Sequence, residues 1–301
     1  MLQRGTFLFI VLVSNLGLIY DTAATGYIIR GTFETPNIDA KQDLHTQKTL
    51  DHIGFLRSND DIKGMMKAVL VFVKSRRTLP QNVITSLFTQ LKSVIMDKRK
   101  EVQEWKLQSH PVATRYVMID LPTISIGLIS REVDEFCTQV IELIEKYLLP
   151  SEKEATLQCS YITLKADYLR YMAEFSNSYG YKGTLSARAL EEYRNAEKCA
   201  RNLAGLSDSN EILLGILLNR SVLEYEIMEN KSAARETCLR AMENAHRKPS
   251  GISKLLGVAT QLSDPAICVL QSIKRNVEVW NLGVSNQEIE DEWIMCDVSN
   301  V

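Results

Sequence analysis

Three cationic side chains and a tyrosine occur on predicted helices at positions where they could bind an anion. Arg170 precedes Tyr171 in the segment Tyr161–Phe175, whose apolar residues recur at intervals of three and four and so predict an amphipathic α-helix. A guanidinium on the flank of such a stripe can lie half buried and present a fork of donors to a planar or tetrahedral anion. The alternative is an arginine that extends along the edge of the helix to water.

Lys92 and Arg99 lie seven residues apart on another predicted helix, and Gln103 follows four residues later. These spacings put the three side chains on one face of that helix. Such a face could supply further positive charge to the same anion. The neighbouring Lys98 and Lys100 favour the alternative, an ordinary solvated face.

Asn219 is a polar residue inside an apolar helix. The run from Glu211 to Met228 is apolar on nearly all sides until Asn219, so it predicts the most enclosed helix of the fold. A buried carboxamide without hydrogen bonds costs about 1–3 kcal/mol. Asn219 must therefore bond to a neighbouring helix or face a groove in which the backbone of a ligand completes its hydrogen bonds.

The elements that must position these residues are helices. The chain has only 7 prolines and 14 glycines in 301 residues, and no alternating strand pattern of useful length competes with the helical spacing. The sequence predicts an all-α protein with nine consecutive helices between Gln47 and Trp280. Ser151 with Glu154 predicts a capping box at the start of the fifth helix.

Composition restricts the class of protein. The 35 Lys plus Arg and 37 Asp plus Glu residues give a net charge of −2, with no sign of a protein that binds nucleic acid or a membrane surface. Any anion site must therefore be built from a few placed cations. Six cysteines occur singly, without a CxxC pair, beside only 4 histidines, so neither a metal nor a cofactor is expected. No nucleophile and base pair or phosphate-binding glycine loop points to an enzyme.

The first 44 residues are predicted to be an extension. Met1–Tyr20 resembles the charged and apolar regions of a secretory signal, and Thr22–Ala24 would serve as a cleavage site. The alternatives are an appended hydrophobic anchor and a start codon assigned too far upstream. We expect a cytoplasmic protein, or a secretory-pathway protein if residues 1–24 act as a signal peptide, with membrane contact only if this segment is retained. Residues 284–301 are predicted to form an acidic flexible tail.

Three segments have a composition more specific than helical periodicity: KADYLRYMAEF (Lys165–Phe175), GILLNRSVLEYEI (Gly215–Ile227) and RNVEVW (Arg275–Trp280). In order and spacing they resemble the 14-3-3 family. Weaker matches occur in the family's order at Asp60–Val69, Lys92–Arg99 and Arg131–Ser151. The resemblance implies an all-α domain over residues 45–283, in which nine antiparallel helices form a cup with an amphipathic groove.

Members of that family bind segments that contain phosphoserine or phosphothreonine, so the resemblance implies a non-catalytic adaptor that regulates phosphorylated partner proteins in signalling. The phosphate-binding residues would be Lys92, Arg99, Arg170 and Tyr171. The residues that hold the peptide backbone would be Asn219, Glu226, Asn276 and Trp280, and the apolar wall of the groove would be Leu218, Val222, Val269 and Val279. The resemblance also implies a homodimer, or a heterodimer with another 14-3-3 protein.

The sequence departs from the family pattern at several positions. Gln103 stands where the family usually has an arginine, which removes a charge that helps to anchor or orient the phosphate-binding arginines. Asp61 and Glu132 remain at the family's dimer contact, but their partners there are Leu128 and Ser58, so the usual salt bridges cannot form. These departures leave an alternative function: a scaffold of the same fold that has lost phosphate dependence and acts through phosphorylation-independent or heterodimeric contacts.

Overall fold

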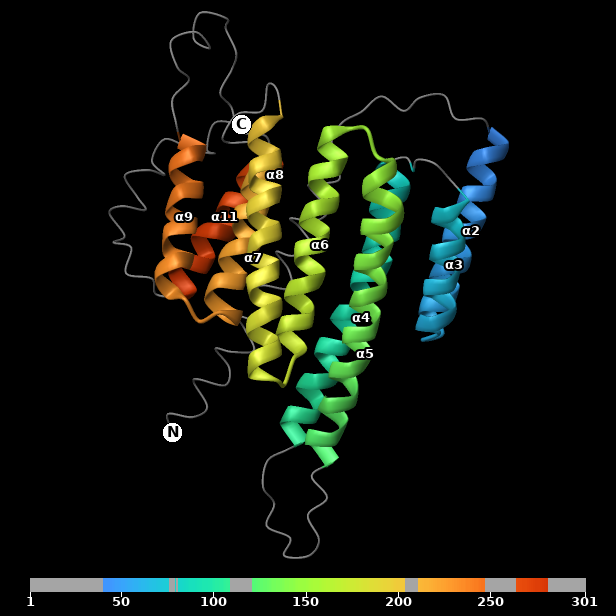
Figure 1. Ribbon diagram of the computed structural model, residues 1–301, viewed down its shortest axis with the longest axis horizontal. Helices are drawn as coiled ribbons and strands as arrows, with labels where there is room; N and C mark the ends of the chain where they lie inside the picture. Colours follow the sequence, from blue (N-terminus) through green and yellow to red (C-terminus); the bar gives the residue numbers. More distant parts are fainter. Residues whose placement is uncertain are drawn as a thin grey trace, which may run out of the picture. The chain divides into compact units, whose positions relative to one another are not determined.

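The computed structural model describes residues 40–75, 79, 81–108, 121–203, 211–246 and 264–280, and every regular element in these ranges is helical (Figure 1). The all-α prediction is therefore confirmed. The predicted extension and the predicted acidic tail lie almost entirely outside the described ranges and stay predictions. The α-helices are α2 (Ala40–Ser58), α3 (Ile62–Lys74), α4 (Gln81–Gln108), α5 (Leu121–Leu143), α6 (Ala155–Phe175), α7 (Tyr179–Asn202), α8 (Glu211–Val222), α9 (Lys231–His246) and α11 (Asp264–Val279).

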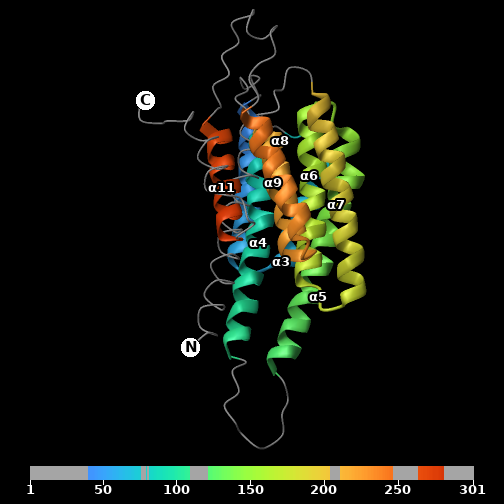
Figure 2. The same cartoon turned by 90° about the vertical axis from the view of Figure 1, so that its left-hand side faces the viewer.

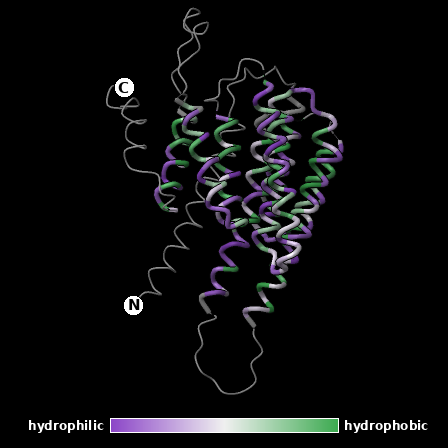
Figure 3. The backbone as a smooth tube through the Cα atoms, turned by 60° about the vertical axis from the view of Figure 1, so that its left-hand side comes forward, coloured by the Kyte–Doolittle hydropathy of each residue, from purple (hydrophilic) through white to green (hydrophobic). Residues whose placement is uncertain are grey.

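The chain divides into two units, and the first comprises residues 29–192. In it α2 contacts α3 and α4, α4 contacts α5, and α5 contacts α6 (Figures 1 and 2). Helix α2 begins at Ala40, earlier than the predicted Gln47, because its first turns carry too few apolar residues to show a periodicity. Hydrophobic and hydrophilic residues alternate along the helices (Figure 3), as amphipathic packing requires.

Helix α6 is more enclosed than its predicted single stripe. Of its 21 residues, 15 are buried, and these include the small or hydroxyl-bearing Ser160, Thr163 and Ala166. Thr163 satisfies its hydroxyl by donating to the carbonyl oxygen of Cys159 at 2.9 Å. Residues of this kind can be buried without appearing in a hydrophobic pattern, so the pattern showed only part of the buried surface of the helix.

The capping box predicted at Ser151 and Glu154 is wrong. Helix α5 continues through a π-helical turn (Ile144–Leu148) and a 3₁₀ turn (Leu149–Ser151), so Ser151 belongs to the end of the preceding element. Its hydroxyl donates to the carbonyl oxygen of Tyr147 at 2.7 Å. The backbone before α6 is ordered instead by Glu152, whose carboxylate accepts from the N–H groups of the next two residues at 2.8 and 2.9 Å.

The second unit contains the described chain from Tyr193 onward. Helix α8 contacts α9 and α11, and α9 contacts α11. As predicted, α8 is enclosed on nearly all sides, with 10 of its 12 residues buried. It continues into a π-helical turn, Leu223–Ile227, which carries Glu226.

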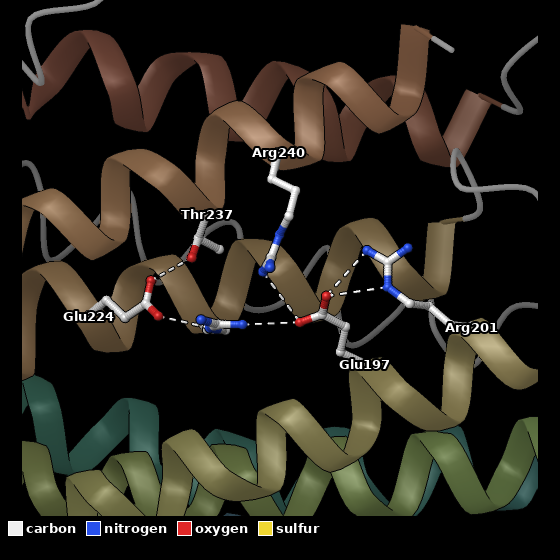
Figure 4. Close-up of polar contacts among 6 residues, drawn as sticks. Glu197, Arg201, Glu224, Thr237 and Arg240 are labelled. Atoms are coloured by element: carbon white, nitrogen blue, oxygen red, sulfur yellow. Dashed lines mark hydrogen bonds and ion pairs between the residues drawn. The ribbon is translucent and has the colours of Figure 1, made fainter. Parts of the chain in front are cut away.

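A buried ion network joins α7, α8 and α9 in this unit (Figure 4). Glu197 on α7 accepts a hydrogen bond of 3.0 Å from Arg220 on α8. Arg220 also donates to Glu224, one turn along the same helix, at 2.8 Å. The second oxygen of Glu224 accepts from the Thr237 hydroxyl on α9 at 2.7 Å. Because both carboxylates are buried and the Arg220 side chain is only 12% exposed, each depends on the others for compensation of its charge.

Glu197 is the shared acceptor of the network. Besides Arg220 it contacts Arg201 at 3.2 Å and Arg240 at 3.4 Å, and both of these arginines are about a third exposed. Water can therefore solvate the outer two guanidiniums, whereas Arg220 lies deeper. The network thus has a buried centre and a solvated rim.

Glu197→Ala should lower the free energy of unfolding by roughly 3 kcal/mol, which is the lower end of the cost of breaking a buried ion pair. The lower end applies because Arg220 keeps its ion pair with Glu224. The control Arg201→Ala removes only a rim contact and should cost less than about 1 kcal/mol. Urea denaturation of both variants measures the difference. Equal effects would contradict the distinction between centre and rim.

Candidate functional site

Two guanidiniums converge on the ring of Tyr171 in the first unit. The central carbon of Arg99, on α4, lies 5.1 Å from the ring centroid, and that of Arg170, on α6, lies 4.7 Å from it. Both distances allow an attraction between cation and ring, worth about 0.5–2 kcal/mol each. The packing of α4, α5 and α6 thus brings together two arginines that are 71 residues apart in the sequence.

The site is buried. Arg170 is 3% exposed and Tyr171 is 1% exposed, so the alternative of an arginine that reaches water along the helix edge is wrong. Lys92 is also buried, at 7% exposure. A charge in such a place must be compensated by hydrogen bonds or by an opposite charge.

Two carboxylates of α6 compensate part of this charge. Glu174 accepts from Nε and Nη2 of Arg99 at 2.8 and 2.5 Å, a bidentate pairing. Asp167, itself buried, places Oδ1 3.8 Å from Nη2 of Arg170, beyond hydrogen-bond length. Lys92 is a further buried cation of the first unit. The sequence reading missed Glu174, although it stands one helical turn after Arg170 and could have been found by that spacing.

The side chains on and beside the predicted cationic face of α4 differ in their exposure to solvent. Lys92 and Arg99 are turned into the unit, whereas Lys100 is exposed. Lys98 is intermediate and binds Glu132 of α5 at 2.7 Å and Glu101 at 3.0 Å. Burial alone would lower the pKa of Lys98, but the two carboxylates outweigh it and raise that pKa. The solvated-face alternative is therefore wrong for Lys92 and Arg99 and correct for Lys100.

The residues predicted to hold a peptide backbone lie in the second unit. Asn219 on α8 is buried, and Glu226 in the adjoining π-helical turn is half buried. Asn276 and Trp280 stand one turn apart at the end of α11, each 4% exposed. The Trp280 ring stacks on that of Tyr225, with centroids 4.3 Å apart and planes at 9°. This stack fixes the orientation of the indole.

Asn276 and Trp280 each have a buried donor without a protein acceptor. Among the described residues, neither Nδ2 of Asn276 nor Nε1 of Trp280 has a hydrogen-bond partner. Buried polar groups in proteins are nearly always paired with protein, water or ligand. Two such donors one turn apart therefore mark a place where an acceptor other than the described residues can bind.

The predicted wall residues lie on the same two helices. Leu218 and Val222 of α8 and Val269 of α11 are buried, and Val279 is half buried. Helices α8 and α11 are in contact within the second unit. The groove and the cup stay predictions, because the phosphate-site residues belong to the first unit.

The described part of the chain offers no other chemistry of the kinds considered. No three His, Cys, Asp or Glu residues within it gather as metal ligands, and none of its helices is long and apolar enough to cross a membrane. The described cysteines are free thiols. Burial raises the pKa of Cys137, and it raises that of Cys238 to about 12, so both are protonated at neutral pH.

The fold and the site together define an all-α protein with a buried cationic site on two neighbouring helices. A family model described as "14-3-3 protein" matches residues 54–281, and the chain belongs to this family. It is similar to "Checkpoint signal transducer rad24" of Schizosaccharomyces pombe (31% identity over 153 residues, 50% of this chain and 53% of the relative). It is also similar to "14-3-3-like protein GF14-G" of rice, Oryza sativa subsp. japonica (30% over 153 residues, 51% and 56%), and to "14-3-3 protein" of Eimeria tenella (28% over 164 residues, 54% and 56%). The matched part of this chain thus spans a little more than half the length of each of these relatives.

Asn276→Leu tests whether the donor of Asn276 contributes to folding. Leucine has a similar shape and no donor, so the free energy of unfolding should stay within about 1 kcal/mol of the wild-type value or rise, because a polar group without a partner adds no hydrogen bond on folding. Thermal or urea denaturation measures it. A loss of more than about 2 kcal/mol would show that the carboxamide has a structural partner.

Proposed function

We propose that this chain is a non-catalytic adaptor that binds phosphoserine- or phosphothreonine-containing segments of partner proteins. The observation that carries the proposal is the convergence of the Arg99 and Arg170 guanidiniums on Tyr171 in a buried site. A phosphoryl group brings about −1.5 to −2 charges and three acceptor oxygens. Two guanidinium forks, the ammonium of Lys92 and the phenol of Tyr171 match that charge and that number of acceptors.

Within the second unit by itself, buried donors suit the backbone of a peptide. An extended peptide carries a carbonyl acceptor at every residue. Asn276 and Trp280 supply buried donors for these carbonyl oxygens, and Asn219 and Glu226 add polar groups on the neighbouring α8. The apolar wall residues on α8 and α11 would receive side chains of the ligand. A role in signalling agrees with the name of the fission-yeast relative, a checkpoint signal transducer.

A second candidate function is a scaffold of the same fold without phosphate dependence. It is favoured by the partial neutralisation of the site, since Glu174 already binds Arg99 and Gln103 adds no cation. Partners that stay bound after phosphatase treatment would support this scaffold. Partners released by the phosphatase would support the phosphate-dependent adaptor.

Arg170→Ala tests phosphate binding. Hydrogen bonds to charged groups contribute roughly 1.5–3 kcal/mol each, so the variant should bind a pool of fluorescent phosphoserine peptides at least about 10-fold more weakly, and its preference over the phosphatase-treated pool should vanish. Arg170→Lys keeps a charge beside Asp167 and guards against misfolding. It should still lose most of the preference, because lysine lacks the fork.

Arg131→Ala is the matched control, since it removes an exposed arginine of α5 in the same unit. It should leave the affinity for both pools unchanged. Equal affinity of the wild-type chain for the phosphorylated and the treated pool would contradict the proposed function.

The partners include a second copy of the chain or another 14-3-3 protein, joined by apolar surface. The two acidic residues at the expected dimer contact already have partners within the chain: Asp61 accepts from the N–H of Gly64 at 2.8 Å, and Glu132 binds Lys98. Phe55 on α2 and Val71 on α3 are both 63% exposed, although they are apolar. Burial of such side chains would replace the missing salt bridges. We place the protein in the cytoplasm, with the secretory pathway as the alternative if residues 1–24 act as a signal peptide.

Phe55→Asp should convert a two-chain assembly into single chains, because it puts a charge where apolar surface would be buried. Light scattering after size-exclusion chromatography measures the mass. Tyr179→Asp, at a tyrosine of α7 that is fully in solvent, is the control and should keep the wild-type mass. A wild-type chain that runs as a monomer at micromolar concentration would exclude self-association, and an unchanged mass for Phe55→Asp would exclude this surface.

A further inference from the structure

Arg99 is held on three sides. Glu174 takes its Nε–Nη2 edge in a bidentate pairing, Met96 places its sulfur 3.8 Å from Nη1, and the Tyr171 ring lies beneath the guanidinium at 5.1 Å. The Arg99 side chain is only about a tenth exposed. These contacts restrict the Arg99 side chain to one orientation, whereas an unpaired arginine would populate many rotamers.

Two of the three residues that hold Arg99, Glu174 and Tyr171, come from the helix turn that carries the other arginine. Arg170, Tyr171 and Glu174 occupy positions i, i+1 and i+4 of α6. Residues four apart on a helix are neighbours on one face. Glu174 thus connects Arg99 of α4 to the turn of α6 that supplies Arg170 and Tyr171.

From this geometry we propose that Glu174 is a positioning residue of the phosphate site. Because Glu174 accepts from both donors of the Nε–Nη2 edge, it fixes the orientation of the Arg99 guanidinium before a ligand binds. The inference rests on the proposed function, and it assigns to Glu174 the task of holding Arg99 in one orientation.

Positioning and competition make opposite predictions. As a positioning residue, Glu174 removes in advance the rotamer freedom that Arg99 would otherwise lose on binding, so it strengthens binding. As a competing anion it would oppose the phosphoryl charge, so its removal would strengthen binding. The bidentate geometry and the burial of Arg99 favour positioning, since a carboxylate that must leave on binding would not need to hold both donors of one edge.

The binding experiment compares Glu174→Ala, Glu174→Gln and the control Glu142→Ala on the phosphoserine peptide pool. Glu174→Ala should weaken binding roughly 10–100-fold, by analogy with the effect of removing the carboxylates that orient metal-binding residues. Glu174→Gln should be intermediate, because its amide oxygen can still accept one of the two bonds. Glu142→Ala removes a half-exposed carboxylate that pairs with Lys146 on the surface, and it should change nothing. In an Arg99→Ala background, Glu174→Ala should have no further effect.

A second readout does not need the ligand. The Nε–H of Arg99 should exchange slowly with water in the full wild-type chain and in Glu142→Ala, and much faster in Glu174→Ala, as measured by ¹⁵N NMR. Unchanged exchange, or tighter phosphopeptide binding by Glu174→Ala, would overturn the positioning role. So would a loss of affinity that persists in the Arg99→Ala background. A wild-type chain that ignores phosphorylation would refute the proposed function, while the exchange measurement would still decide how Arg99 is held.

Discussion

The convergence of two guanidiniums on one buried tyrosine is the interaction on which the rest of the account depends. Arg99 and Arg170 would repel each other in a place where water cannot screen them. Glu174 and Asp167 compensate this repulsion in part, and the Tyr171 ring gives both cations a common surface. Lys92 is a further buried cation of the same unit. Each of these charges depends on polar or charged neighbours for its stability.

The second unit shows the contrast between satisfied and unsatisfied polar groups. The carboxylates of Glu197 and Glu224 bind their arginines and a hydroxyl, so the network joins α7, α8 and α9 as a structural element. The donors of Asn276 and Trp280 have no protein acceptor in the described part of the chain. The two carboxylates of the network are thus paired, whereas the donors of Asn276 and Trp280 leave hydrogen bonds for a ligand to complete. Both sets are polar, so the presence or absence of hydrogen-bond partners distinguishes the carboxylates of the structural network from the donors of the candidate site.

Sequence periodicity could predict whatever depends on one helix. It gave the helical class, the shared face of Lys92 and Arg99, and the enclosure of α8, because each follows from spacing along a single element. It could not predict the Glu197 network, whose members come from three helices and meet only through packing. The capping box failed for a related reason, since π-helical and 3₁₀ turns carried Ser151 into the preceding element. The i+4 spacing could have predicted that Glu174 lies on the same face as Arg170. It could not have predicted that Glu174 pairs with Arg99 of α4.

The most direct test of the account is a crystal structure of the full chain bound to a phosphoserine peptide selected from the pool. We expect phosphoryl oxygens within hydrogen-bond distance of both Arg99 and Arg170, with Glu174 still on the Nε–Nη2 edge of Arg99. A phosphoryl group bound away from these arginines, or a peptide held without contact between its phosphate and the protein, would contradict the central claim.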